Sequence, residues 1–182
     1  ERAMRSVFDW QYENLGSPEP DWLQAVFMIG VVSAYEATGD TVYLGAAQRW
    51  SRANEWRLGP RELHADDHAA GQVYLDLARL TGDTSGTVAT DATLRGLIGS
   101  TKSADRIWWW CDALFMAPPA LVRAASVTGD PTFVSSLAGM WWDAADPLFD
   151  GEERLFHRDS AARDHRDGVP PLSSHGNRAF WS

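Results

Sequence analysis

The tripeptide Thr38-Gly39-Asp40 recurs as Thr81-Gly82-Asp83 and as Thr128-Gly129-Asp130, at intervals of 43 and 47 residues. Each copy follows a stretch with apolar residues at helical spacing, and a glycine just past a helix supplies the left-handed residue that ends it. The aspartate that follows can cap the next helix. The repeated unit is therefore expected to be a helix, a Thr-Gly-Asp turn and a second helix.

Two helices are expected in each of three units. The first helices are predicted at 22–37, 70–80 and 113–127, and the second helices at 42–53, 87–98 and 131–145. A period of roughly 40 to 50 residues with two helices is typical of an α-helical repeat, either an open solenoid or a closed ring of hairpins. No alternating β pattern competes, so the expected fold class is all-α.

The connections between the units carry most of the polar and aromatic residues that are suited to binding or catalysis. They are predicted at 54–68, 99–112 and 146–182. In a ring of hairpins, connections of this kind meet at one end, where residues distant in sequence come together. A functional site is therefore expected among them.

Composition narrows the class of protein. The 182 residues suit one domain, and a net charge of −9 argues against a surface for nucleic acid or anionic membrane. Cys111 is the single cysteine of the sequence, which rules out an intrachain disulfide. The longest apolar run, 25–32, is too short to span a bilayer, and no signal-peptide pattern is present. The bacterial cytoplasm is the expected location, with the periplasm or secretion left open because the N-terminus need not be complete.

Tryptophan is unusually frequent, with ten residues in the chain. Most of these side chains are expected to pack in the core, but a flat ring with a polar N–H edge is also what binds a sugar. The stretch 108–119, WWWCDALFMAPP, places one carboxylate, Asp112, beside three of them. Asp112 is either the N-cap of a helix or a carboxyl group that aromatic walls shield from water, which would raise its pKa and suit a general acid.

The stretch 64–68, HADDH, combines two carboxylates with two histidines. It is open to three interpretations: a metal site, an N-cap made by Asp66 or Asp67, or a carboxylate that positions substrate or takes part in catalysis. The stretch 155–159, LFHRD, is either a salt-bridged surface loop or a receptor for an anionic substrate.

Several segments, read in order, resemble the unsaturated rhamnogalacturonyl hydrolases, glycoside hydrolase family 105, which are related to the unsaturated glucuronyl hydrolases of family 88. The Asp-Asp-His block and the Trp-Cys-Asp-Ala-Leu-Phe-Met-Ala-Pro-Pro block are the most specific. The matching segments are Asp21-Trp22, 35–40, Trp50 with 54–56, 64–75, 109–119, 155–159 and 180–182.

The resemblance implies an (α/α)6 toroid of six helical hairpins. Members of the family are about twice as long as this chain, so residues 1–182 are expected to be the N-terminal portion of a single (α/α)6 catalytic domain, about half of the ring. The implied activity is removal of a 4,5-unsaturated uronyl residue from lyase-generated oligosaccharides of the rhamnogalacturonan or pectin type. The enzyme protonates C4 of the vinyl ether and adds water at C5. No metal or organic cofactor is implied, and the oligomeric state stays unknown.

The resemblance also assigns roles to individual residues. Asp112 matches the general acid and base, and the second carboxylate falls at Asp66 or Asp67, with neighbouring His68 favouring Asp67. Local cations, Arg158, Arg106 or His64, are expected to offset the negative net charge. The residues expected to bind substrate are Trp22, His64, His68, Trp109, Met116, His157, Arg158 and Trp181.

Two other functions are kept as alternatives. One is a different sugar-active (α/α)6 enzyme, either an epimerase or a conventional hydrolase. The other is a helical repeat that binds carbohydrate without catalysis.

Overall fold

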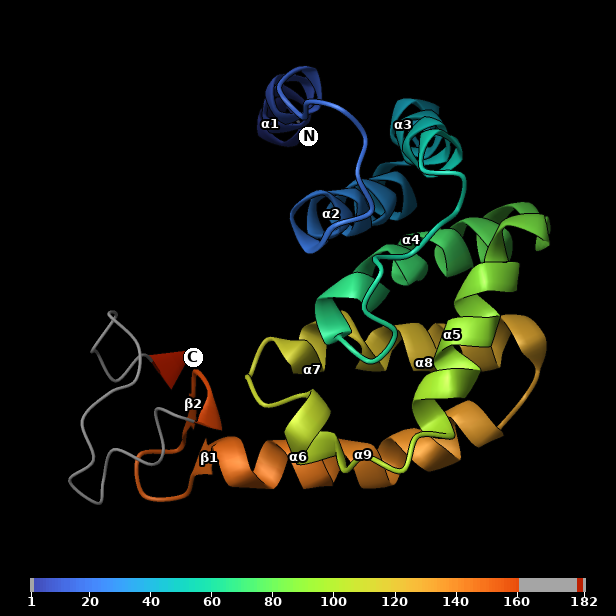
Figure 1. Ribbon diagram of the computed structural model, residues 1–182. Helices are drawn as coiled ribbons and strands as arrows, with labels where there is room; N and C mark the ends of the chain where they lie inside the picture. The colour runs from blue at the N-terminus through green and yellow to red at the C-terminus, as the bar shows by residue number, and fades with distance from the viewer. Residues whose placement is uncertain (1, 161–179, 182) are drawn as a thin grey trace.

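The computed structural model describes residues 2–160 and the backbone of 180–181, and these residues are mostly helical (Figure 1). The helices are α1 Arg2–Glu13, α2 Trp22–Thr38, α3 Thr41–Ala53, α4 Ala65–Thr81, the 3-10 helix η1 Ser85–Thr87, α5 Val88–Ile98, α6 Ala104–Ile107, α7 Ala113–Met116, α8 Pro118–Thr128 and α9 Thr132–Leu148. The strands β1 Phe149–Asp150, β2 Leu155–His157 and β3 Phe180–Trp181 form a small antiparallel sheet in that order. None of the described helices combines the length and the apolar character needed to cross a lipid bilayer.

The three Thr-Gly-Asp turns have the same construction, as the repeat predicts. Each glycine has a positive φ, 71° at Gly39, 77° at Gly82 and 74° at Gly129. Each threonine hydroxyl donates to the carbonyl four residues earlier, at 2.7 to 2.8 Å. Each aspartate accepts from the backbone N–H two residues later, at 2.9 to 3.0 Å. The tripeptide thus ends one helix through the glycine backbone and the threonine hydroxyl, and starts the next through the aspartate side chain.

The helices form consecutive hairpins in two layers, so the predicted all-α fold is confirmed. Helices α2, α4 and α8 lie side by side as an inner row, while α3, α5 and α9 lie outside them (Figure 1). The three inner helices begin on the same side of the molecule, the side where β1 and β2 also lie. The N-terminal ends of the inner helices and the connections that lead into them therefore share one rim.

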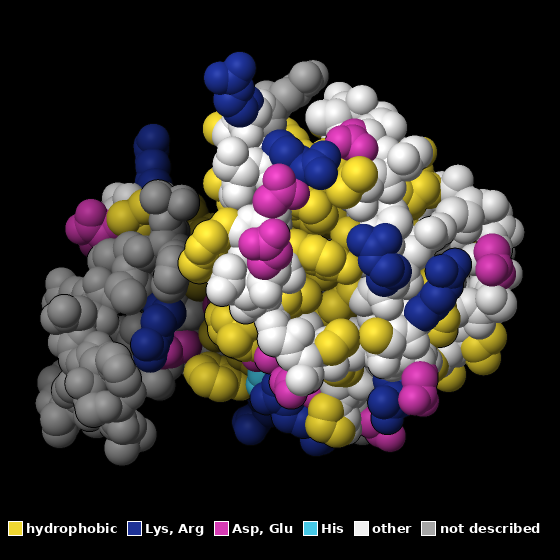
Figure 2. Space-filling view, turned by 90° about the horizontal axis from the view of Figure 1, so that it is seen from above, with side chains coloured by type: hydrophobic (Ala, Val, Ile, Leu, Met, Phe, Trp, Pro, Cys, Tyr) yellow, Lys and Arg dark blue, Asp and Glu magenta, His cyan; other side chains and the backbone are white. Residues whose placement is uncertain are grey.

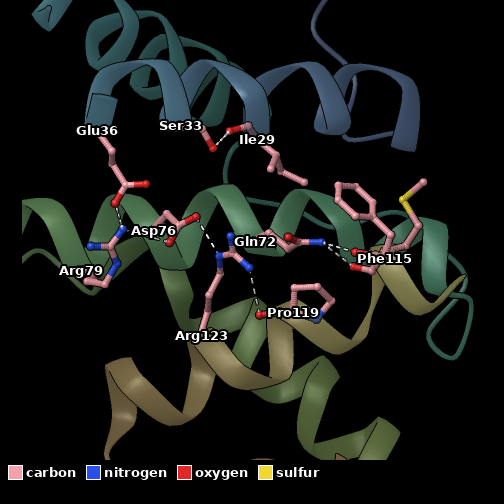
Figure 3. Close-up of polar contacts among 10 residues, drawn as sticks. Ile29, Ser33, Glu36, Gln72, Asp76, Arg79, Phe115, Pro119 and Arg123 are labelled. Carbon is pink, nitrogen blue, oxygen red and sulfur yellow. Dashed lines mark hydrogen bonds and ion pairs between the residues drawn. The ribbon is translucent and has the colours of Figure 1, made fainter. Parts of the chain in front are cut away.

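Polar contacts join the inner helices to one another (Figure 3). The buried carboxylate of Asp76 on α4 accepts from Arg123 Nε on α8 at 2.8 Å and lies 3.3 Å from Arg79 Nη2. Arg79 in turn pairs with Glu36 on α2. The positions of α2, α4 and α8 relative to one another are thereby fixed by charge as well as by apolar packing.

The helix expected over 113–127 is broken, because α7 ends at Met116 and α8 begins at Pro118. Proline lacks a backbone N–H, so it suits the first turn of a helix. It also interrupts the backbone hydrogen bonds of a helix that precedes it. Gln72 Nε2 on α4 donates to the carbonyls of Phe115 and Met116, at 2.8 and 2.9 Å (Figure 3). One side chain therefore satisfies the carbonyls left at the break and anchors the end of α7.

Other elements also differ from the sequence prediction. Helix α4 begins at Ala65 rather than at residue 70, so Asp66 and Asp67 lie within its first turn. Helix α1 was not expected, because Phe8 is the one apolar residue of this polar segment that is buried. The strands after α9 were likewise unexpected, since each is only two or three residues long.

An apolar groove of about 400 Å³ lies between α1 and α2. Figure 2 looks down on the side that carries α1 to α3 and shows hydrophobic side chains gathered across it. The groove is lined by Ala3, Met4, Val7, Phe8, Val26, Phe27, Gly30, Val31, Ala34 and Tyr43. Apolar surface of α1 and α2 is therefore exposed on this side of the molecule.

We expect Gly82→Ala to lower the free energy of unfolding by about 1 kcal/mol, because a Cβ disfavours the left-handed backbone at φ 77°. Gly96→Ala is the matched control. Gly96 lies inside α5 with a helical backbone and open space around the added Cβ, so its substitution should raise stability by about 0.5–1 kcal/mol. Urea unfolding measures both. Equal effects of the same sign would contradict the capping role of the Thr-Gly-Asp turn.

Candidate active site

The described parts of the three connections meet at one cavity of about 360 Å³. The cavity lies at the rim formed by the N-terminal ends of α4 and α7, as expected from the hairpin order. Its wall consists of Arg61, His64, Asp66, Trp109, Trp110, Asp112, Arg158 and Asp159. The set holds three carboxylates, two guanidinium groups and three aromatic or imidazole rings, a mixture suited to a polar ring-shaped ligand.

Backbone pairing brings the second and third connections together. Trp110 and Asp159 form an antiparallel bridge. The N–H of Cys111 donates to the carbonyl of Arg158, and the N–H of Ser160 donates to the carbonyl of Trp109, both at 2.9 Å. The position of Asp112 relative to Arg158 is therefore set by main-chain hydrogen bonds rather than by side-chain contact alone.

Asp112 lies on the cavity wall at the start of α7. Its carbonyl accepts from the N–H groups of Phe115 and Met116, at 2.9 and 3.1 Å, but its side chain caps no backbone N–H. The N-cap interpretation of the carboxylate is thus not realised. The expected shielding from water is also not found: Asp112 is exposed, because Trp108 is turned into the core and Trp110 packs on His64 instead.

Asp66 points into the same cavity from the first turn of α4 and is largely buried. Its Oδ2 lies 3.6 Å from His64 Nδ1 and 3.8 Å from Arg61 Nη2. Burial raises the pKa of Asp66, and the charges of Asp112 and Asp67 add to that effect against the opposing influence of His64 and Arg61. The Asp66 carboxyl therefore holds its proton to a higher pH than an ordinary aspartate.

Asp67 is buried at 5% exposure and does not line the cavity. Its Oδ2 accepts from the backbone N–H of Arg61 at 2.7 Å, and Arg61 Nε lies 3.1 Å from both carboxylate oxygens. Burial raises the pKa of Asp67, but the hydrogen bonds from Arg61 outweigh it and hold the pKa below its usual value. Gly59 allows the loop that precedes α4 to lie against the Asp67 side chain, since a Cβ at this position would meet Asp67 Cγ at 2.4 Å.

His64 forms part of the wall through its ring, whose centroid is 4.6 Å from that of Trp110 at an interplanar angle of 34°. Burial lowers the pKa of His64, and the charge of Arg61 lowers it further. The imidazole is consequently neutral near pH 7. Of the three local cations that the sequence offers, Arg158 lines this cavity with its permanent charge, whereas burial disfavours the charged form of His64.

The structure separates the other predicted binding residues into two groups. Trp109 and Arg158 line the cavity, as expected. His68, Met116 and His157 do not, because all three are buried: His68 Nε2 lies 2.8 Å from the carbonyl of Glu62, and His157 Nε2 lies 3.6 Å from Asp150 Oδ2. Trp22 is exposed at the start of α2 but is not on the wall. The side chain of Trp181 lies outside the described residues.

Sequence reasoning missed the contribution of Arg61, Trp110 and Asp159 to the cavity. Arg61 stands six residues before Asp67 in a connection already singled out, and an arginine close to a pair of aspartates is a signal for an ion pair. Asp159 closes the quoted LFHRD stretch and pairs with Arg158 Nε at 2.7 Å. In the described part of the chain, no group of three or more His, Cys, Asp or Glu side chains is placed to hold a metal ion.

We expect the free energy of unfolding to fall as the pH is lowered from about 7.5 to about 5.5, partly because of His68. Burial lowers the pKa of His68 below its ordinary 6.5, although the hydrogen bond to the Glu62 carbonyl and the charge of Asp67 oppose it, so below that pH the unfolded chain binds a proton that the folded chain excludes. Chemical unfolding at both pH values measures the effect. His68→Gln, which can still donate to Glu62, should show a weaker pH dependence, and an identical dependence would contradict the assignment.

Comparison with known proteins places the chain in a family. The sequence model of glycosyl hydrolase family 88 matches residues 2–182. An unsaturated 3S-rhamnoglycuronyl hydrolase from Formosa agariphila is 32% identical over 175 residues, which cover 87% of this chain and 46% of the relative. A protein of the same name from Alteromonas sp. strain LOR is 30% identical over 214 residues, covering 99% of this chain and 50% of the relative. The chain thus spans about half the length of the curated relatives it matches.

Solved structures share the fold. A glycosyl hydrolase family 88 protein from Bacteroides vulgatus superposes with a TM-score of 0.80 at 22% identity, over 99% of this chain and 56% of the other. A chain described as a polysaccharide lyase superposes with a TM-score of 0.78 at 23% identity, over 98% of this chain and 56% of the other. The helical hairpins are thereby confirmed as about half of a helical toroid, and the match over residues 2–182 shows that the chain belongs to glycosyl hydrolase family 88.

Proposed function

We propose that the protein removes a 4,5-unsaturated uronyl residue from the non-reducing end of oligosaccharides made by polysaccharide lyases. Residues 1–182 supply the N-terminal portion of the (α/α)6 catalytic domain in this proposal. The observation that carries it is the meeting of two carboxylates, Asp66 and Asp112, in one cavity with the tryptophans Trp109 and Trp110. The names of the two curated relatives agree with an unsaturated uronyl substrate.

Asp66, rather than Asp67, is the second carboxylate in this mechanism. Asp67 is almost fully buried, and its two oxygens are occupied by the guanidinium and backbone N–H of Arg61. Asp66 faces the cavity and is close enough to Asp112 for the charge of Asp112 to act on its pKa. Asp66 therefore takes the place of Asp67, which the neighbouring His68 favours in the sequence, because Asp67 and His68 are both buried and lie off the cavity wall.

Asp112 is assigned the proton transfers. It donates a proton to C4 of the vinyl ether and accepts a proton from the water whose oxygen bonds to C5. Asp66 lines the same cavity, and burial raises its pKa, so its carboxyl group retains a proton to a higher pH than an ordinary aspartate. Arg61 and Arg158 supply positive charge for the uronyl carboxylate, and Trp109 offers a flat surface for the sugar ring.

Release of the neighbouring sugar follows from the hydration step. The hydroxyl added at C5 makes a hemiketal, and cleavage of the bond between C5 and the ring oxygen leaves a ketone at C5. C1 then carries both a hydroxyl and the glycosidic oxygen, and this hemiacetal collapses to an aldehyde and the free neighbouring sugar. One water is consumed, and the glycosidic bond breaks without direct attack at C1.

An unsaturated disaccharide tests the proposal. The ultraviolet absorbance of the conjugated C4–C5 double bond should disappear with enzyme, and a reaction in heavy water should place one deuterium at C4 of the product. The matched saturated disaccharide should not be cleaved. A conventional hydrolase would cleave it and leave C4 unlabelled, an epimerase would release no sugar, and a binding module would turn over neither compound.

A further inference from the structure

Asp159 places a third carboxylate in the wall of the cavity that holds Asp66 and Asp112. Its side chain is buried. A further negative charge weakens the binding of a uronyl carboxylate unless a positive group offsets it. The proton transfers assigned to Asp112 do not involve Asp159. Asp159 therefore has a role in this wall that the proton transfers do not explain.

The carboxylate of Asp159 binds one edge of the Arg158 guanidinium group. Arg158 Nε donates to Asp159 Oδ2 at 2.7 Å, and Arg158 Nη2 contacts the same oxygen. A guanidinium group is planar and can bind oxyanions along more than one edge. Asp159 occupies the edge that Nε forms with Nη2. The outer edge, which Nη1 forms with the second N–H of Nη2, is not used by Asp159 and suits a second carboxylate.

Backbone contacts fix the segment that carries this pair. Asp159 forms an antiparallel bridge with Trp110, and the carbonyl of Arg158 accepts from the N–H of Cys111. The chain bends at Arg158, so two consecutive side chains both reach the wall, whereas in a regular strand they would point to opposite faces. The Asp159 side chain is 6% exposed and that of Arg158 is 37% exposed. The fold thus holds the aspartate, and the aspartate holds the more exposed arginine.

The other arginine of the cavity wall, Arg61, has the same kind of partner. Its guanidinium group is bound by Asp67, which is also buried. An unrestrained arginine side chain has many rotamers, and a ligand that it binds must order them. An arginine that is already held loses less freedom on binding, so the same contact gives a higher affinity. Both pairs are therefore suited to presenting a cation in a fixed orientation to an anion.

We propose that Asp159 is a positioning residue, which holds the outer edge of the Arg158 guanidinium group toward the carboxylate of the unsaturated residue. The inference rests on the proposed function, which places that carboxylate in this cavity. Asp159 contacts none of the reacting atoms in this arrangement and acts on the substrate through Arg158 alone. Its removal should consequently weaken binding of the substrate and of the transition state equally, which raises KM and leaves kcat unchanged.

A double-mutant cycle tests the proposal with an unsaturated disaccharide. Asp159→Asn should raise KM about tenfold and leave kcat within about twofold, because the arginine must then be ordered on binding. The variant that combines Asp159→Asn with Arg158→Met should have the KM of Arg158→Met, since no guanidinium group remains to be positioned. The proposal is overturned if the two effects on KM multiply in the double variant, if Asp159→Asn leaves KM unchanged, or if it lowers kcat instead.

Asp76→Asn is the matched control. Asp76 is also a buried aspartate that pairs with an arginine, Arg123, but neither residue lines the cavity. Its substitution should lower the free energy of unfolding in urea and leave KM unchanged. Asp159→Ser is prepared beside Asp159→Asn, and a variant that keeps the folded state enters the cycle. Failure of both variants to fold would make Asp159 a structural residue and would overturn the positioning role.

Failure of the proposed function gives a different result. If the protein turns over the unsaturated disaccharide and the cycle fails, the function stands and only the role of Asp159 is lost. If no unsaturated disaccharide is turned over, the function fails, and calorimetry with a saturated disaccharide that ends in a uronic acid tests Asp159 by itself. Weaker binding by Asp159→Asn, with equal binding by Arg158→Met and the double variant, supports the positioning role. Equal binding by Asp159→Asn and the unsubstituted protein, or no binding by either, overturns it.

Discussion

Replacing Asp112 with Asn is expected to lower kcat/KM on an unsaturated disaccharide by about 10³-fold, the contribution of a well-placed general acid and base. Asparagine has nearly the same shape but can neither give a proton to C4 nor take one from water. The Asp112 side chain is exposed and caps no backbone group, so the fold does not depend on it. Stability should change by less than about 0.5 kcal/mol.

Asp143→Asn is the matched control for this experiment. Asp143 is also an exposed aspartate, but it lies on α9 and does not line the cavity. Its substitution should leave both kcat/KM and the free energy of unfolding unchanged. Activity retained within about tenfold by Asp112→Asn would contradict its assignment as the proton donor, and loss of the folded state by that variant would contradict the absence of a structural role.

Replacing Arg61 with Met is expected to lower the free energy of unfolding by about 2 kcal/mol, because it leaves the Asp67 carboxylate buried without its guanidinium partner. Loss of one partner from a fully buried pair costs more, but here the Arg61 side chain is 54% exposed and its backbone N–H remains bonded to Asp67. Since Arg61 also lines the cavity that holds Asp66 and Asp112, kcat/KM should fall as well.

The pH dependence of the stability lost in Arg61→Met shows whether the pair with Asp67 causes the loss. Arg61 holds the pKa of Asp67 below the ordinary 3.8, so its stabilising effect is present above that pH and is lost as the pH falls through the folded-state pKa. The difference between the two proteins in urea unfolding should therefore be largest near neutrality and shrink below about pH 3.8. Arg57→Met, which breaks an exposed contact of 3.7 Å with Glu55, should cost less than about 0.5 kcal/mol. An equal loss in both variants would argue against the buried pair.

The sequence was most informative where the chemistry is local. The Thr-Gly-Asp turns were predictable because threonine, glycine and aspartate each act on backbone groups within four residues of their own position. The break before Pro118 was also readable from the proline, but the apolar spacing continues through it and suggested one long helix. The start of α4 at Ala65 could not be predicted from the sequence, because hydrogen bonds from Arg61 in the preceding loop to Asp67 hold its first turn.

The same distinction applies to the site. The meeting of three connections followed from the order of the hairpins and was predicted. The local backbone conformation decides which side chain faces the cavity, so residues adjacent in sequence can point in different directions. Asp66 faces the cavity while Asp67 is buried, and Arg158 faces it while His157 is buried. A contact such as that between Trp110 and Asp159, 49 residues apart, exists only once both segments have folded.

The short helix α6 and the two carboxylates of the cavity, Asp66 and Asp112, are held by different parts of the fold. Ala104 and Ile107 are buried, and α6 packs against α9 in the outer layer, whereas Asp66 and Asp112 stand at the starts of α4 and α7. Natural variation in residues 99–107 can consequently alter the charge beside Trp109 while the acid pair stays in place. Exchange of this single surface segment among family members is therefore a compact route for evolution, or for an engineer, to change the surface beside Trp109 without moving Asp66 or Asp112.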